Sequence, residues 1–334
     1  MLTALTATPT SLPSIVQQRL RETRSGKEKR AKRVTAASAD ASGEQLSIFV
    51  SAESESLDRD VTTFENGYDS DVQRLSVGVD FQATAQWVAG LAFDASKQDG
   101  SFKGGGDFDA RSYGFVGFGM FLPTEKTFVQ FYGGYAQDSY NRHRFGSFAY
   151  LADDGSPLLP PALSGTQKAD YDADQYRAGL LLGYDYPVAN VTLGPFASLD
   201  WKRTRFGTYS EMGTSGLELT FHDDRQTSMQ SGLGLKASIL LRPASWSIVP
   251  QVSATWKHEF ENGQRDIAVS FVGDLRGKRF TYQTEVPDRD WGEVNIGVSA
   301  ISPRGLQLFG NFRTLVGSKY FDSRAVSVGL RLPF

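Results

Sequence analysis

Residues 171–206 decide the fold, and they read YDADQYRAGLLLGYDYPVANVTLGPFASLDWKRTRF. Two alternating runs flank a short turn at 187–189. In the first run one face carries Tyr176, Ala178, Leu180, Leu182 and Tyr184, and the other carries Gln175, Arg177, Gly179, Gly183 and Asp185. A period of two indicates a β-strand with one apolar and one polar face. Because globular strands usually have about five or six residues, runs of this length predict an unusually long hairpin.

The same alternation continues in both directions along the chain. It also places Val326, Val328, Leu330 and Leu332 on one face of the last run, opposite Ser327, Gly329 and Arg331. We predict twelve strands, at residues 46–56, 69–83, 86–98, 108–122, 126–141, 171–186, 190–206, 226–242, 246–261, 289–301, 305–318 and 323–334.

The connections between these strands alternate in length. The predicted long ones are residues 57–68, 99–107, 142–170, 207–225 and 262–288, and the second-last of these includes a strand extension at 217–221. The short ones are residues 84–85, 123–125, 187–189, 243–245 and 302–304, and residues 319–322 are intermediate. Outer-membrane barrels have short turns on the periplasmic side and long loops outside. The chain is therefore predicted to be all-β, with a transmembrane antiparallel β-barrel of about twelve strands over residues 46–334.

Composition agrees with a barrel and excludes membrane helices. No run approaches the roughly eighteen apolar residues that a spanning helix needs. A soluble antiparallel sheet also alternates apolar and polar residues. Strand length and aromatic residues near strand ends favour the membrane barrel, the latter being Trp87, Phe121, Tyr184, Tyr186, Trp201, Trp256 and Trp291. The chain has no cysteine, which suits a protein that crosses an oxidising compartment unfolded.

Residues 1–45 are predicted to be a basic linker. Residues 1–33 contain eight Lys or Arg and two Glu, and the first eighteen show neither the basic start nor the apolar run of a signal peptide. Residues 12–24 can form a helix, with Pro13 in its first turn and Gly26 beyond its end. A flexible basic tail is the alternative. We predict no nucleic-acid partner, since such a run is usually a solvated linker.

The C-terminal run SVGLRLPF, residues 327–334, resembles the outer-membrane β-signal. That pattern has a polar residue, a glycine two positions later, alternating hydrophobic residues and a terminal aromatic. The matching positions are Ser327, Gly329, Leu330, Leu332 and Phe334. The resemblance implies recognition by the barrel-assembly machinery, through strand addition at a sheet edge.

Further segments resemble the β-barrel translocator domain of autotransporters. They are LSVGVD at 75–80 leading into 87–93, SMQSGLGLKAS at 228–238, VPQVSATWKHEF at 249–260, and the stretch from Asp290 to the end. The resemblance covers residues 46–334. It implies type V secretion, in which a twelve-stranded barrel in the bacterial outer membrane contacts lipid, anchors an N-terminal passenger and helps move it to the cell surface.

In that family a helical linker threads the barrel before the first strand. The hypothesis for this chain is that Arg19, Arg21 and Arg24 meet acidic groups in the lumen. The proposed acidic partners are Asp80, Asp185, Asp200 and Glu293.

The sequence offers no catalytic constellation, metal site or cofactor site. His143, His222 and His258 are too far apart in the sequence for metal-ligand spacing. No Gly-x-Ser-x-Gly motif of a hydrolase is present. The barrel is therefore predicted not to be an enzyme. Two alternatives remain: a stand-alone barrel whose outer loops act as an adhesin or receptor, and a barrel hydrolase.

Overall fold

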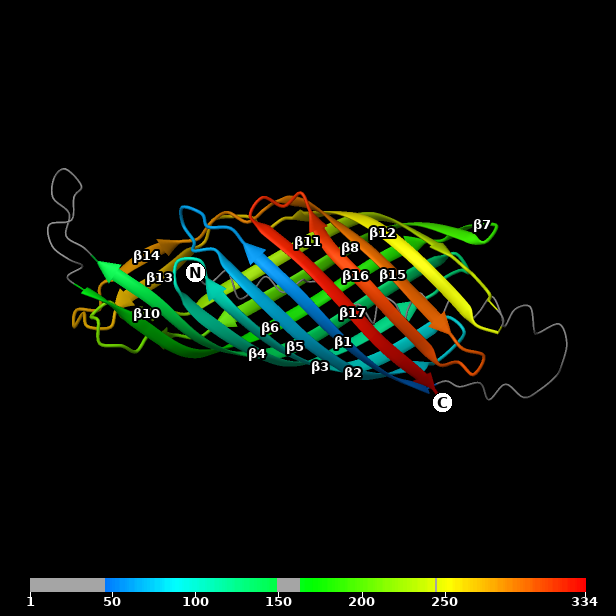
Figure 1. Ribbon diagram of the computed structural model, residues 1–334, viewed down its shortest axis with the longest axis horizontal. Coiled ribbons are helices and arrows are strands. Elements are labelled where there is room, and N and C mark those ends of the chain that lie inside the picture. Colours follow the sequence, from blue (N-terminus) through cyan, green and yellow to red (C-terminus); the bar gives the residue numbers. More distant parts are fainter. Residues whose placement is uncertain (1–45, 149–162, 244) are drawn as a thin grey trace.

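The computed structural model describes residues 46–148, 163–243 and 245–334, which form a barrel of long, tilted strands (Figure 1). No helix within these ranges is long and apolar enough to cross a membrane. The barrel strands are β1 (Leu46–Arg59), β2 (Tyr68–Gln82), β3 (Trp87–Phe102), β4 (Gly106–Phe121), β5 (Thr127–Phe148), β6 (Leu163–Tyr184), β8 (Val191–Phe206), β11 (Asp224–Ile239), β12 (Ser247–Glu259), β15 (Asp290–Ile301), β16 (Gln307–Val316) and β17 (Phe321–Pro333).

The barrel is closed by antiparallel pairing all the way round. Each barrel strand pairs with the next barrel strand in the chain, and β8 pairs directly with β11. The last strand, β17, returns to the first, β1, with Val50 opposite Leu330 in the register. The predicted twelve-stranded antiparallel barrel is thus confirmed.

Two predicted long loops are shorter than expected. Strands β5 and β6 have 22 residues each, so the connection predicted at 142–170 shrinks to 149–162. The connection predicted at 99–107 is a tight turn at 103–105, where Gly105 has a positive φ of 94°. Both predictions were wrong because the strands project beyond the apolar band, where their outward side chains are polar. Ser139, for example, donates a hydrogen bond to Asp172 across the β5–β6 pair.

The long connection between β1 and β2 covers residues 60–67, and two further long connections form structure of their own. Residues 207–223 contain β9 (Tyr209–Ser210) and β10 (Leu219–Phe221), the latter inside the predicted extension at 217–221. Residues 260–289 contain β13 (Asp266–Phe271) and β14 (Arg279–Gln283). These four strands form one sheet in the order β14–β13–β10–β9, which we name the cap sheet. It lies at the end of the barrel opposite the C-terminus (Figure 1), and β7 (Tyr186–Val188) extends a hairpin at the C-terminal end.

The two faces of each strand differ as the alternation predicts. On β17, Val326 and Val328 point outward and are 54% and 55% exposed. Ser327, which lies between them, and Arg331 point inward and are buried. Exposed apolar side chains recur on the outward face of the other barrel strands. A band of this kind indicates a surface that faces lipid.

Glycines on the inner face receive aromatic rings from neighbouring strands. A Cβ atom at Gly78 would collide with the ring of Phe49, and one at Gly90 would collide with the ring of Phe118. The same arrangement occurs next to the closing seam, where Phe309 of β16 covers Gly329 of β17. These pairs explain why glycine and aromatic residues are both abundant: the ring needs the space that a missing side chain leaves.

We expect Gly329→Val to lower the free energy of unfolding by about 1–3 kcal/mol, because the new side chain forces the Phe309 ring out of its site. The measurement is the temperature at which refolded protein in detergent loses its folded mobility on a gel. Gly133→Val is the matched control, since a Cβ at Gly133 has no atom within 4 Å. Combining Gly329→Val with Phe309→Ala should recover part of the loss. Equal effects of the two valine variants would contradict the packing argument.

Candidate functional site

The candidate site is the lumen, and its first layer is apolar. This layer lies toward the end that holds the C-terminus. It consists of Phe49, Val88, Ala92, Val116, Phe118, Met120, Leu122, Phe128, Tyr132 and Phe309, with Leu181 packed against it. Most of these residues point inward, on the face of each strand that elsewhere carries polar residues, whereas the opposite face of the strand meets lipid. The inside of the barrel is therefore a packed core at this level rather than a uniformly wet surface.

A charged layer follows along the lumen. Its ion pairs are Arg74–Glu53 (2.7 Å), Arg313–Glu55 (3.1 Å), Lys257–Asp200 (3.0 Å) and Arg177–Asp94. Ser323 also donates a hydrogen bond to Glu55, and Tyr132 donates one to Asp200 at 3.0 Å. Burying an unpaired charge is costly, so these charges are tolerated because each has an opposite charge from another strand.

The third layer joins the barrel to the cap sheet. Its buried residues from the barrel are Leu57, Tyr68, Val72, Phe102, Phe108, Ala110, Tyr140, Ala169, Tyr171, Ala173 and Phe206, and those from the cap segments are Tyr209, Phe221, Ile267 and Val269. The rings of Tyr171 and Tyr209 stack with centroids 4.0 Å apart, and Tyr209 stacks on Phe221 at 4.9 Å. The cap sheet therefore packs on the inner face of the projecting strands.

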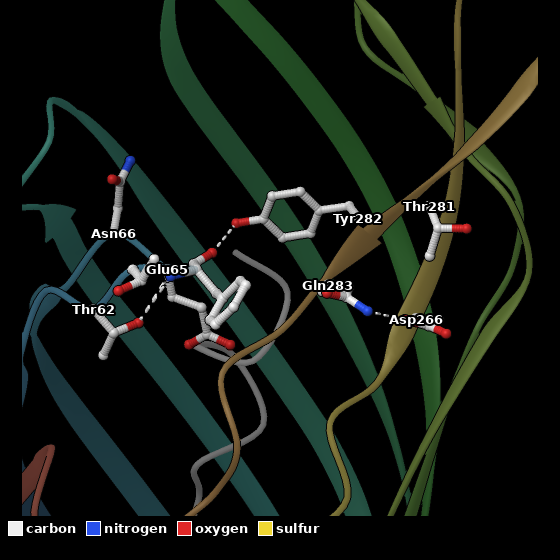
Figure 2. A pocket seen from close by; sticks show the side chains of 9 residues that line it. Thr62, Glu65, Asn66, Asp266, Thr281, Tyr282 and Gln283 are labelled. Carbon is white, nitrogen blue, oxygen red and sulfur yellow. Dashed lines mark hydrogen bonds between the residues drawn. The ribbon is translucent and has the colours of Figure 1, made fainter.

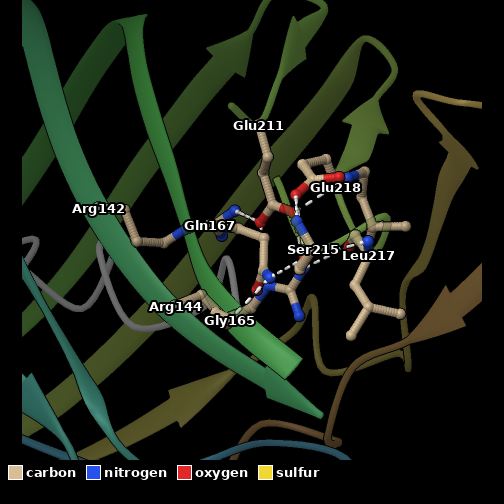
Figure 3. Close-up of polar contacts among 9 residues, drawn as sticks. Arg142, Arg144, Gly165, Gln167, Glu211, Ser215, Leu217 and Glu218 are labelled. Atoms are coloured by element: carbon tan, nitrogen blue, oxygen red, sulfur yellow. Dashed lines mark hydrogen bonds and ion pairs between the residues drawn. The ribbon is translucent and has the colours of Figure 1, made fainter. Parts of the chain in front are cut away.

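One side of the cap is held by Glu211 (Figure 3). Arg142 donates to its Oε1 at 2.9 Å, and Arg144 donates to its Oε2 at 2.6 Å. The Glu211 and Arg142 side chains are fully buried. The Arg142 guanidinium also lies 4.9 Å from the ring centre of Phe221. Two cations on β5 thus share one carboxylate of the cap.

The opposite side of the cap is held by the connection between β1 and β2 (Figure 2). Tyr282 of β14 donates its hydroxyl proton to the carbonyl oxygen of Phe64. Glu65 pairs with Arg59 at 2.7 Å and accepts a hydrogen bond from the backbone N–H of Glu285 at 3.1 Å. A hollow of about 670 Å³ lies between this connection and the β13–β14 hairpin. The cap sheet is therefore fastened at two separated places on the rim.

Two groups in the cap have shifted pKa values. Hydrogen bonds from the backbone N–H groups of Arg276 and Lys278 lower the pKa of the Asp274 carboxyl. The stabilisation of the turn by these hydrogen bonds is fully present above the ordinary pKa of aspartate. It is lost as the pH falls through the lowered pKa of Asp274. Burial raises the pKa of the Tyr282 hydroxyl, so its hydrogen bond to Phe64 persists to a more alkaline pH than an exposed tyrosine would allow.

The predicted β-signal residues form the closing strand. Ser327 and Gly329 face the lumen, whereas Leu330 and Leu332 are exposed on the outer face. Phe334 follows the strand and donates its backbone N–H to the carbonyl oxygen of Leu46 at 2.9 Å. The run that resembles an assembly signal is thus the strand that completes the barrel.

The four predicted lumen acids lie at different heights, and three already form ion pairs with barrel cations. Asp80 pairs with Arg331 at 3.2 Å, Asp185 pairs with Lys236 at 2.8 Å, and Asp200 pairs with Lys257 at 3.0 Å. Glu293 accepts a hydrogen bond from Asn295 at 2.8 Å. The proposed linker partners Arg19, Arg21 and Arg24 lie outside the described residues.

Sequence reasoning missed the basic partners of these acids and the whole cap fastening. Lys236, Lys257 and Arg331 were visible at polar positions of alternating strands, but nothing local indicated which acid each would meet. Glu211 and Arg142 were assigned to loops, so no signal singled them out. Over the described ranges, no group of three or more His, Cys, Asp or Glu residues is arranged to hold a metal ion.

Comparison with known proteins gives matches over most of the chain. A family model described as "Autotransporter beta-domain" matches residues 48–313. Outer membrane protein A of Rickettsia conorii is 25% identical over 275 residues, which cover 80% of this chain and 13% of that protein. Esterase EstA of Pseudomonas aeruginosa is 26% identical over 300 residues, which cover 86% of this chain and 42% of the esterase. The chain thus spans less than half the length of these relatives.

Solved structures show the same fold. The translocator domain of the autotransporter NalP from Neisseria meningitidis superposes with a TM-score of 0.66 at 13% identity, covering 95% of this chain and 98% of that domain. The β-domain of the Bordetella autotransporter BrkA gives a TM-score of 0.62 at 18% identity, covering 87% of this chain and 100% of that domain.

We expect Glu211→Gln to loosen the cap sheet, because Arg142 and Arg144 lose the charge that both contact. Breaking a buried ion pair typically costs about 3–5 kcal/mol of stability. We expect this loss to affect the capped end and not the rest of the barrel. The measurement is single-channel current in planar bilayers, where the variant should show larger or more frequent openings than the unaltered barrel. Glu261→Gln, an exposed change in a neighbouring connection, is the control. Identical currents for both variants would show that Glu211 does not hold the cap.

Proposed function

This chain belongs to the autotransporter β-domain family, and from that premise we propose that it anchors an N-terminal passenger and supports its export to the cell surface. The barrel is an outer-membrane translocator domain. The capped end is then the outer end, and the end with the short turns and the C-terminus is the periplasmic end.

The observation that carries the proposal is the position of Leu46. The first strand begins at the periplasmic end, where the Leu46 carbonyl accepts the N–H of Phe334. A passenger that precedes Leu46 is therefore attached on the side opposite the cell surface. It has to pass the length of the barrel to reach the outside, and the cap sheet lies at the exit.

We also propose that the barrel-assembly machinery reads the last strand. The strand β17 presents Leu330 and Leu332 outward and places Gly329 under Phe309. Before closure with β1, its edge carries unpaired backbone groups, which a partner strand can bind. The assembly signal and the closing seam would then use the same backbone edge in succession.

The linker hypothesis is retained as a proposal, with Glu293 as its strongest acidic candidate. Asp80, Asp185 and Asp200 already contact barrel cations, so a linker arginine would have to share them. Among residues 46–148, 163–243 and 245–334, Glu293 forms no ion pair within 4 Å, and it interacts with Lys257 and Arg313 only at longer range. We propose that Arg19, Arg21 or Arg24 reaches Glu293 from the lumen.

We propose that the barrel itself is not catalytic, although two similar proteins are named esterases and one is named a lipase. The Ser–His contact in the described part of the chain is His222 Nε2 to Ser270 Oγ, at 3.2 Å. No carboxylate is hydrogen-bonded to that ring among the described residues, whereas a hydrolase triad needs one to orient the histidine. A loop-mediated adhesin role is the second candidate, favoured by the polar hollow beside Tyr282.

A reporter fused before Met1, behind a secretion signal, should become accessible to added protease on intact cells. The control is the same fusion without residues 321–334, which removes β17 and prevents closure of the barrel. A reporter that stays protected while the full barrel shows its folded gel mobility would refute the export proposal.

The linker contact can be tested by disulfide trapping, since the chain has no cysteine of its own. We expect Glu293→Cys to form a disulfide with a cysteine placed at position 19, 21 or 24, seen as a mobility change on a non-reducing gel. The control is Asp290→Cys, on the same strand but on the outer face, where its side chain pairs with His258. Equal trapping at positions 290 and 293, or none at 293, would contradict the proposal.

A further inference from the structure

The outward face of β8 and β11 changes abruptly from apolar to basic. Leu193, Leu199 and Trp201 point outward along β8, and the next two outward positions toward the outer end are Arg203 and Arg205. The paired strand β11 places Met229 opposite Trp201, Thr227 opposite Arg203, and Arg225 opposite Arg205. Three arginines thus lie just beyond the apolar band, at the level where the headgroups of the outer leaflet begin.

None of these three arginines forms an ion pair within the described ranges of the chain. Some other basic groups on the outer face have acidic partners: Lys97 pairs with Asp99, His143 with Asp107 and His258 with Asp290. Arg111 and Arg324 are also exposed without an ion pair among the described residues, but neither lies opposite another arginine in the register. Asp174 lies opposite Arg205 on β6, but its Oδ1 accepts the Tyr135 hydroxyl proton at 2.6 Å. The arginines are therefore basic groups with unused donors.

The pairing of Arg205 with Arg225 is unfavourable by itself. Like charges directly opposite on neighbouring strands destabilise a sheet. An anion bound between them would remove that repulsion. Arg203 donates to the Thr227 hydroxyl at 3.4 Å, a contact too long to occupy the guanidinium fully.

Aromatic rings hold two of the guanidinium groups at this level. The Arg203 guanidinium carbon lies 5.6 Å from the ring centre of Trp201, and that of Arg205 lies 5.5 Å from the ring centre of Tyr176. Cation–π contacts of this kind restrict the side chain while leaving its N–H groups free to donate. The rings lie toward the apolar band, so the charged groups are presented at the membrane surface.

We infer that Arg203, Arg205 and Arg225 bind the phosphate groups of a lipid in the outer leaflet. Guanidinium groups match phosphate oxygens with paired hydrogen bonds, and weakly hydrated Arg is favoured for such contacts. The apolar ladder below them, from Leu193 to Trp201 and Met229, provides the surface for the acyl chains of the same lipid. The lipid site does not depend on passenger export.

The test uses the full chain refolded in detergent, with native mass spectrometry counting bound lipopolysaccharide. We expect Arg203→Gln/Arg205→Gln/Arg225→Gln to weaken binding by about tenfold or more, since it removes three positive charges that attract the anionic lipid. The control is Lys126→Gln/Arg242→Gln/Arg304→Gln, which removes the same charge from exposed periplasmic turns. A variant with lysine at 203, 205 and 225 should retain part of the binding.

Three results would overturn the inference. If the glutamine variant at 203, 205 and 225 binds lipopolysaccharide as well as the glutamine variant at 126, 242 and 304, the three arginines are not the site. If enzymatically dephosphorylated lipopolysaccharide binds as tightly as the intact lipid, phosphate recognition is excluded. If inorganic phosphate, at a concentration equal to that of the lipopolysaccharide, displaces the lipid fully, a contribution from the acyl chains is excluded. Folded gel mobility of each variant confirms that lost binding is not lost structure.

Discussion

The rest of the structure depends on the closing pair between β1 and β17. Lipid offers no hydrogen-bond partner to backbone N–H and C=O groups, so an open sheet edge cannot remain in the membrane. The register from Ser47 opposite Pro333 to Arg59 opposite Phe321 removes both edges at once. Closure then fixes which face of every strand points inward, because successive side chains alternate. The inner layers and the outer apolar band both follow from this constraint.

Closure also explains the chemistry of the lumen. A barrel of twelve strands brings acids and bases from distant parts of the chain into one enclosed space, where isolated charges are costly. Arg331 reaches Asp80 and Arg313 reaches Glu55, and both pairs lie at or beside the seam. The lumen acids that a threading segment can contact are thus partly neutralised by the barrel itself. A passing segment has to compete with these pairs or use an acid such as Glu293.

The two ends of the barrel differ because the connections differ. At the periplasmic end the strands are joined by short turns, whereas residues 207–223 and 260–289 form the cap sheet at the outer end. Glu211 and Tyr282 hold that sheet at separate points on the rim. On the outside, the same end presents Arg203, Arg205 and Arg225 above Trp201. The outer end therefore combines a fastened exit with a basic surface at the lipid headgroups.

The sequence by itself determined the strand number, the two faces and the closing strand, because a period of two is a local property that each strand shows independently. It overestimated the loops at 99–107 and 142–170, since projecting strands with polar outer faces look like loops. Only the tertiary structure decided the partners of Asp80, Asp185 and Asp200, the clamp of Arg142 and Arg144 on Glu211, and the alignment of Arg205 with Arg225. These contacts depend on the register between strands, and the register is set by closure of the whole barrel rather than by any single segment.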